Sequence, residues 1–330
     1  MTTQKDIAEK LGVSVALVSR ALSGKAEAIG VAAATVRRIH AEAERRGYIP
    51  NASARLLRGG PSRTLGVVVF DFADPFFGPF IDELHRLAHA AGHSLVLIGV
   101  EHRCVEPRAL QPLLKHGVGG VIVLGSGGDS HGLAILAERR LPVARIGHGP
   151  LDGVALTTHV DERAGVAAVL AHLAQTRRTT VGFLGGIHPA QEERFEHYRA
   201  GLKAAGLTSK PAWQLFSAET LMQAGYAACR QLLAQTRHDL PAALVAGSDV
   251  VALGALRALK EAGLNVPQDI AVTGFDDIPV AQLVTPALTT VRQPIARMAR
   301  LAFDAVTLVE EVPTKRHTVC LPTLVVRESA

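Results

Sequence analysis

From residue 64 onward, short apolar segments alternate with longer segments whose apolar residues recur at helical spacing. The segments that this pattern predicts as strands are LGVVVF, SLVLIGV, GGVIVLG and LPVARIG in a first set, and VALTTHV, TVGFLGG, AALVAGS and DIAVTGF in a second set. Strands that alternate with helices form parallel sheets covered by helices on both faces. Two sets that together span ~220 residues predict an α/β fold with two doubly wound lobes rather than one very wide sheet.

The first 47 residues lack this alternation and are predicted to form three short helices. Thr3, with Asp6 three positions later, can cap a first helix that ends at Gly12, and Ser14 can cap a second helix. Only the residues GVS separate these two helices. So short a turn forces the helices to cross sharply, which predicts a helix-turn-helix arrangement.

Positive charge is concentrated in the N-terminal fifth of the chain. The 330 residues carry a formal net charge of +5. Residues 1–63 contain 11 Lys and Arg against 5 Asp and Glu, whereas residues 64–330 contain 24 against 25. A solvated basic face is one interpretation, but an excess confined to one end is also typical of a module that binds a polyanion such as DNA.

The sequence contains no motif that indicates catalysis, a metal or a cofactor. Its three cysteines lie far apart, without the C-x-x-C spacing of a zinc cluster or redox pair. The glycines after GGVIVLG invite a dinucleotide-binding interpretation, but Ser130 stands where the G-x-G-x-x-G pattern requires glycine. We therefore expect neither an enzyme nor a bound cofactor or metal ion.

The chain also lacks a recognisable targeting or membrane signal. The N-terminus MTTQKDIAEK carries charges and no apolar run behind them, unlike a secretory signal. No segment reaches the ~18 uninterrupted apolar residues of a membrane span. We expect a cytoplasmic protein with no membrane partner.

Ligands of open parallel sheets bind beyond the carboxyl ends of the strands. The side chains that the predicted strands place there converge on one cleft if two lobes face each other, although each alone is more often a helix cap or turn residue. They are Asp71, Asp74, Phe76, Phe77, His148, Asp161, His188, Ser248, Asp249, Asp276 and Asp277. Of these, we expect Asp74, Phe76, Phe77, His148, Asp161, His188, Ser248 and Asp276 to bind the ligand.

Successive blocks of the sequence resemble one known family. These blocks are KDIAEKLGVSVALVSRALSG, RGYIPNASARLLRGG, TLGVVVFDFADPFFGPFIDEL, VDERAG, GFLGG, ALGALRALKEAGLNVPQDIAVTGFDDIPVA and TPALTTVRQP. In this order they are similar to the lactose-repressor (LacI/GalR) family of transcriptional regulators. The resemblance implies a helix-turn-helix head with a hinge helix (residues 1–58, hinge at about 50–58), a linker (59–63), and a core of two lobes like that of periplasmic sugar-binding proteins (64–330).

The resemblance also implies which residues contact DNA. In the head they are Thr3, Ser14, Val15, Ala16, Ser19 and Arg20, and in the hinge helix they are Asn51, Ala54, Leu57 and Arg58. Val15 and Ala16 occupy the family's base-reading positions, where apolar side chains can contact a thymine methyl group but cannot form bidentate hydrogen bonds. Hydrogen-bonded readout is then left to Arg20, and Leu57 matches the leucine that wedges between base pairs in the minor groove.

In the core, the resemblance adds Arg194 as the effector-binding arginine to the strand-end residues named above. Asp74 and Ser248 replace asparagines that are usual in the family, and His197 replaces a glycine. These departures predict an altered ligand polarity or specificity.

The function we predict is a sequence-specific DNA-binding regulator, expected to repress transcription as a homodimer. A small-molecule effector in the cleft, either a sugar, a sugar phosphate or a purine, would control its affinity for double-stranded operator DNA. The alternative is a solute-binding protein with the same core and no regulatory role.

Overall fold

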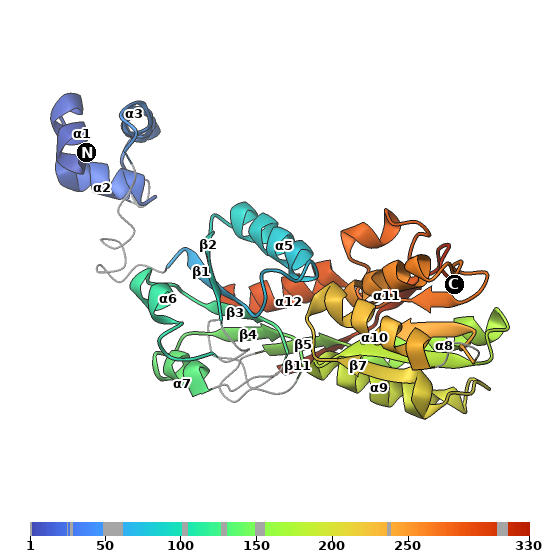
Figure 1. Cartoon of the computed structure of the whole chain (residues 1–330). Coiled ribbons are helices and arrows are strands. Elements are labelled where there is room, and N and C mark those ends of the chain that lie inside the picture. Colours follow the sequence, from blue (N-terminus) through green and yellow to red (C-terminus); the bar gives the residue numbers. More distant parts are fainter. Residues whose placement is uncertain are drawn as a thin grey trace. The chain divides into compact units, whose positions relative to one another are not determined.

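The computed structural model describes residues 2–24, 26, 29–48, 62–100, 105–126, 131–148, 156–235, 239–308 and 316–330. The chain divides into two compact units, Met1–Ser62 and Arg63–Ala330 (Figure 1). The first unit is the head, and the second is the core. None of the helices in these ranges combines the length and the apolar character needed to cross a bilayer.

The head contains three helices: α1 (Gln4–Leu11), α2 (Val15–Leu22) and α3 (Ala33–Arg45). The predicted caps are confirmed. The Thr3 hydroxyl accepts a hydrogen bond from the Asp6 amide, and the Asp6 carboxylate accepts one from the Thr3 amide at 2.7 Å. Gly12 ends α1 with φ at 65°, and the Ser14 hydroxyl accepts a hydrogen bond from the Leu17 amide. Neighbouring residues therefore set both ends of α1 and the start of α2.

A small apolar cluster holds the three helices of the head together. Ile7 of α1, Val18 of α2 and Ile39 of α3 are fully buried in it. Each helix contributes a single apolar face, so the opposite faces stay in solvent.

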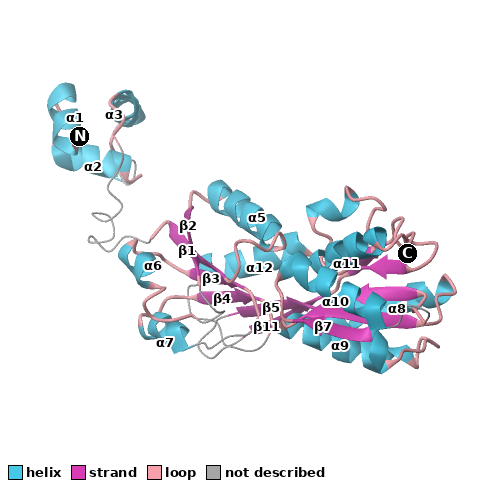
Figure 2. Cartoon of the chain, viewed as in Figure 1, coloured by secondary structure: helices cyan, strands magenta, loops and turns pink. Residues whose placement is uncertain are grey.

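The first lobe of the core is built on a six-stranded parallel sheet (Figure 2). In spatial order its strands are β11 (Arg316–Cys320), β5 (Leu156–Val160), β4 (Val143–Ile146), β3 (Val121–Leu124), β1 (Thr64–Val69) and β2 (Ser94–Gly99). The helices of this lobe are α5 (Phe77–Ala90), α6 (Gln111–Lys115), α7 (His131–Glu138) and α12 (Ile295–Thr307).

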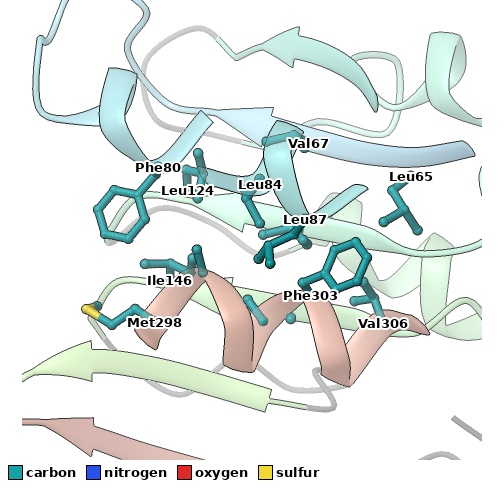
Figure 3. Packing of buried hydrophobic residues seen from close by; sticks show 14 of the residues in the cluster. Leu65, Val67, Phe80, Leu84, Leu87, Leu124, Ile146, Met298, Phe303 and Val306 are labelled. Atoms are coloured by element: carbon teal, nitrogen blue, oxygen red, sulfur yellow. The ribbon is translucent and has the colours of Figure 1, made fainter. Parts of the chain in front are cut away.

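Successive residues of β1 face opposite sides of this sheet, as the period of a strand requires. Leu65 and Val67 pack with Leu84 of α5 and Phe303 of α12 on one side (Figure 3). Val68 packs on the other side, in the cluster that includes residues of α6 and α7. The uninterrupted apolar sequence of β1 reflects burial on both faces.

The second lobe is built on a four-stranded parallel sheet with helices on both faces. Its strands, in spatial order, are β7 (Gln214–Ser217), β6 (Val181–Gly186), β8 (Ala243–Ala246) and β9 (Ala271–Thr273). Its helices are α8 (Glu162–Gln175), α9 (Pro189–Leu202), α10 (Leu221–Gln235) and α11 (Asp249–Glu261). A separate antiparallel pair, β10 (Thr290–Arg292) and β12 (Thr323–Val325), completes the lobe, together with the short 3-10 helices Pro211–Trp213 and Pro279–Gln282.

The chain passes between the lobes three times. It leaves the first sheet after β5, returns from β10 to α12, and leaves again between β11 and β12. The assignment of VALTTHV to the second set of strands is wrong, because β5 pairs with β4 and β11 of the first sheet. Local periodicity predicts a strand here, but only contacts with distant strands decide which sheet it joins.

Because the head has its own apolar cluster, Ile39→Ala should destabilise the head alone. Truncating a buried isoleucine lowers the free energy of unfolding by about 2–5 kcal/mol. This is a large part of the stability that so small an apolar cluster provides. In calorimetry of the full chain, the head transition should fall in temperature while the core transition stays in place. Leu84→Ala in the first lobe should lower the temperature of the core transition and leave the head transition in place. If either variant lowered both transitions together, the head and the core would not be independent units.

Candidate functional site

A pocket of about 600 Å³, including its open mouth, lies between the two lobes of the core. Its walls come from the loops at the carboxyl ends of the strands in both sheets. The lining residues are Asp74, Phe76, Phe77, Gly125, Ser126, Ile146, Gly147, His148, His159, Val160 and Met298 from the first lobe, and Glu162, His188, Ala190, Gln191, Arg194, Ser248, Asp276 and Gln293 from the second lobe and its connections.

The first lobe contributes an aromatic corner. The Asp74 carboxylate accepts a hydrogen bond from the Phe76 amide at 2.9 Å, which closes the turn between β1 and α5. The rings of Phe76 and Phe77 meet edge-on at 5.3 Å. Phe77 is buried, whereas Phe76 is half-buried and lines the pocket. The turn thus presents an apolar surface next to a carboxylate.

Gly147 lets the loop after β4 pass close to the loop after β3. Its φ is 147°, and a Cβ atom there would lie 2.3 Å from the Gly125 carbonyl oxygen. Directly after it, the His148 amide donates a hydrogen bond to the Ser126 hydroxyl at 2.8 Å. These contacts hold the His148 ring at the pocket wall.

Arg194 of α9 is buried at the pocket wall and is paired on all sides. Its Nε and Nη2 atoms donate to the two carboxylate oxygens of Glu162 at 2.7 and 3.1 Å. Nη2 also contacts Asp276 at 3.2 Å, and Nη1 donates to the Gly247 carbonyl oxygen at 2.7 Å. The guanidinium lies 3.7 Å from the centroid of the Phe275 ring. This is a bidentate, charge-assisted pair in a buried setting.

The charges of this network shift the pKa values of its members. Burial raises the pKa of Glu162, but the Arg194 charge and the hydrogen bonds from Arg194 and His148 outweigh it and hold that pKa below its ordinary value. Burial likewise lowers the pKa of Arg194, and the charges of Glu162 and Asp276 raise it above the ordinary value. For Asp276 burial prevails and raises the pKa, against the opposing charge of Arg194. Glu162 and Arg194 are therefore the charged partners.

His148 of the first lobe contacts two carboxylates of the second lobe. Its Nε2 atom lies 2.8 Å from Glu162 Oε1, and its Nδ1 atom lies 2.7 Å from Glu193 Oε2. Both ring nitrogens of His148 therefore face carboxylate oxygens of the second lobe. These contacts link the two lobes across the pocket.

Two further histidines continue from His148 along the first sheet. The rings of His148 and His159 are 5.1 Å apart, and His159 Nδ1 lies 2.9 Å from His317 Nε2. Burial, with the neighbouring charges of His148 and His317, lowers the pKa of His159. The neutral form of His159 is therefore favoured.

Asp276 sits on a strained backbone at the end of β9. Its φ is 120°, a region that residues with side chains rarely adopt. Its Oδ1 atom accepts hydrogen bonds from Arg194 and, at 2.7 Å, from the Gln293 amide. Strain of this kind concentrates at ligand-binding positions.

The structure brings together eight of the nine residues predicted to bind the effector. Asp161 is the exception, because its Oδ1 atom caps α8 by accepting a hydrogen bond from the Ala164 amide at 2.8 Å. The prediction missed Glu162, one residue further on. It also missed Ser126, His159, Gln191, Gln293 and Met298 among the lining residues. Ligand binding by the other eight stays a prediction.

The residues of the head that are predicted to contact DNA bases are exposed. Val15 is 45% exposed at the start of α2, and Ala16 and Arg20 also face solvent. The Arg20 guanidinium forms no hydrogen bond or ion pair with any residue that the structure describes. Thr3 is exposed and Ser19 is half-buried. The four hinge residues predicted to contact DNA, Asn51, Ala54, Leu57 and Arg58, lie outside the described ranges.

Comparison with known proteins identifies the family. The model of bacterial regulatory proteins of the lacI family matches residues 3–51, and the model of the periplasmic binding protein-like domain matches residues 170–330. The HTH-type transcriptional regulator GalR of Escherichia coli (strain K12) is 32% identical over 335 residues, which cover 100% of this chain and 96% of GalR. The chain belongs to the LacI family.

Two solved structures of LacI-family type agree with this assignment. The lac repressor dimer bound to operator and the anti-inducer ONPF superposes with a TM-score of 0.85 at 25% identity, covering 99% of this chain and 98% of that one. A complex of the transcriptional regulator CelR with cellobiose gives a TM-score of 0.69 at 28% identity over 100% of both chains. This LacI-family protein is thus a transcriptional regulator with a helix-turn-helix head and a periplasmic-binding-protein-like core.

A metal site has no support in the described part of this LacI-family chain. There, no group of three or more His, Cys, Asp or Glu side chains is arranged to hold an ion. At the pocket, His148 contacts carboxylates, His159 contacts His317, and His188 accepts a hydrogen bond from the Ala190 amide.

Removing one partner of the buried pair should destabilise this LacI-family core strongly. Glu162→Gln leaves Arg194 without its bidentate partner, at a cost of roughly 3–5 kcal/mol in urea unfolding. The combined change Glu162→Met with Arg194→Met should recover most of that loss, because neither charge of the pair is then left buried without its partner. Glu196→Gln, which breaks an exposed pair with Arg199, should have little effect.

The Glu162→Gln variant also tests how the stability of the core depends on pH. Because the pKa of Glu162 is lowered on folding, its stabilising effect is present above its ordinary value of 4.5 and is lost as the pH falls toward the lowered value. The stability difference between the wild type and Glu162→Gln should therefore shrink in acid. A difference that is constant from neutral to strongly acidic pH would contradict the ionised pair.

Proposed function

We propose that this regulator represses transcription by binding a roughly palindromic operator as a homodimer, and that a small molecule in the interlobe pocket controls that binding. It would act in the cytoplasm, where its operator DNA lies. Residues 1–58 would serve as the DNA-binding head and hinge, 59–63 as a linker, and 64–330 as the effector-binding, dimerising core. The lac repressor dimer bound to operator, which is similar over nearly the whole chain, supports this assembly.

The observation that carries the proposal is the exposed start of α2 in a lacI-type head. In helix-turn-helix proteins the second helix enters the major groove, where its first residues contact base edges. Val15 and Ala16 would contact thymine methyl groups there, and Arg20 would donate to guanine. The basic excess of the head would add contacts to the phosphates.

The hinge helix would add contacts to DNA in the minor groove. The segment ASARLLR is short enough to be marginally stable alone as a helix. Folding against DNA would stabilise it, with Leu57 as the wedge and Asn51, Ala54 and Arg58 beside it. An inserted apolar side chain unstacks a base step and bends the duplex.

The effector is proposed to bind in the pocket between the lobes. A sugar, a sugar phosphate and a purine are the candidate classes, and the cellobiose complex of CelR favours a sugar. Asp74, Phe76, Phe77, His148, His188, Arg194, Ser248 and Asp276 would line its site, with Asp161 acting through the cap of α8. The alternative of a solute-binding protein without a regulatory role does not account for a lacI-type head over residues 3–51.

The effector would act through the relative orientation of the two lobes. A ligand shifts such an equilibrium only by the difference between its affinities for the two orientations. Side chains from both lobes line this pocket, so closure around a ligand would change its contacts.

Arg20→Ala should weaken operator binding by ~1–3 kcal/mol and relax the base preference at one position of each half-site. The operator is first obtained by selecting random DNA with the full chain, and affinities are then measured by fluorescence anisotropy over a series of salt concentrations. Arg199→Ala removes another exposed arginine, from α9 of the core, and serves as the control. An Arg20→Ala affinity equal to that of the control, or wild-type binding that does not weaken with salt, would contradict the proposal.

A further inference from the structure

Carboxyl groups outnumber arginine and lysine side chains in the described pocket lining. Arg194 is the only arginine or lysine among the described lining residues, whereas Asp74, Glu162 and Asp276 supply three carboxyl groups. The remaining titratable lining residues are histidines, of which His148 is already bound between two carboxylates. Among the described lining residues, a ligand therefore meets carboxyl groups and no arginine or lysine other than the paired Arg194.

Arg194 is not available to bind an anionic ligand. The edge of a guanidinium that binds a phosphate or a carboxylate in bidentate fashion is here occupied by Glu162. An anionic group on a ligand would have to displace Glu162, whose side chain is only 1% exposed. Its buried carboxylate would then lose its cation, which is strongly unfavourable. Glu162 thus takes the place of a ligand anion.

Two carboxyl groups approach the pocket from opposite lobes. Asp74 lies in the turn after β1, and Asp276 follows β9. Both line the same pocket, and the charge of Asp74 adds to the raised pKa of Asp276, whose main cause is burial. Asp276 Oδ1 accepts hydrogen bonds from Arg194 and Gln293, while Oδ2 accepts none from a described residue. A ligand that donates hydrogen bonds, above all a cationic one, could donate to either carboxyl group.

The rest of the lining suits a ring with apolar edges. Phe76, Ile146, Val160 and Met298 contribute apolar surface next to the carboxyl groups. Ligand pockets combine such surface with a few polar groups that fix orientation. A sugar ring, which has C–H faces and peripheral hydroxyl groups, matches both features.

We propose that the effector is a hydroxyl-rich ring without a phosphate or carboxylate group, and that an amino group in place of one hydroxyl strengthens its binding by lying near Asp74 and Asp276. This inference rests on the proposed function and selects among its effector classes. It excludes sugar phosphates and acidic sugars.

Matched sugars test the inference on the full chain. Glucose, galactose and mannose are each compared with their 2-amino, 6-phosphate and uronic acid forms, and hypoxanthine and guanine represent the purines. Thermal shift identifies the sugar configuration that binds, and calorimetry measures affinity within that series. The amino form should bind about tenfold more tightly than the neutral form, and the phosphate and uronic acid should give no shift.

Two aspartates of one loop provide the matched variants. Asp74→Asn keeps an oxygen that can accept from the Phe76 amide, so the turn is preserved while the charge is lost. The amino form should then bind no more tightly than the neutral one. Asp71 accepts a hydrogen bond from the Ala73 amide in the same loop but is exposed and outside the pocket lining. Asp71→Asn should keep the wild-type preference.

The outcomes separate this inference from the proposed function. Binding of a sugar phosphate, a uronic acid or a purine, with a change in operator affinity, would overturn the inference and leave small-molecule control intact. Equal affinity for neutral and amino sugars in the wild type, or a preference that survives Asp74→Asn, would overturn the role of Asp74. If no compound shifts the melting temperature or the operator affinity, small-molecule control itself is contradicted.

Discussion

The buried ion pair between Arg194 and Glu162 is the interaction on which the ligand pocket depends. Neither charge is tolerable in the interior without the other, so α8 and α9 must bring the two side chains together. The same guanidinium also binds the carbonyl of Gly247 after β8 and the carboxyl group of Asp276 after β9. One side chain thereby fixes the ends of several elements in the second lobe, and a site fixed in advance loses less entropy when a ligand binds.

Most of the fold could be predicted from the sequence because its signals are local. Ser14 and the apolar face of α2 indicate a helix from neighbouring residues alone, and an unbroken apolar segment such as β1 indicates a strand buried on both faces. The lobe to which a strand belongs is not local information. β5 is followed directly by a helix of the second lobe, yet it joins the first sheet through contacts with β11, which lies far along the chain.

Pocket residues that directly follow a strand could be predicted from the sequence. Asp74, His148 and Asp276 were found because parallel strands bring their carboxyl ends to one edge. Glu162 was missed because its neighbour Asp161 is the more conspicuous acid after a strand. The structure uses Asp161 as the cap of α8, which leaves the next side chain to meet Arg194. Sequence spacing cannot distinguish two adjacent acids in this way.

A polar contact can influence the relative orientation of the two lobes only if its two side chains belong to different lobes. Arg194 and Glu162 both belong to the second lobe, so their pair persists in any lobe orientation and favours none. His148 contacts Glu162 and Glu193 from the opposite lobe. Opening the lobes would break these contacts, so they favour the lobe arrangement in which both are made. An effector changes the populations only by the difference between its affinities for the two arrangements.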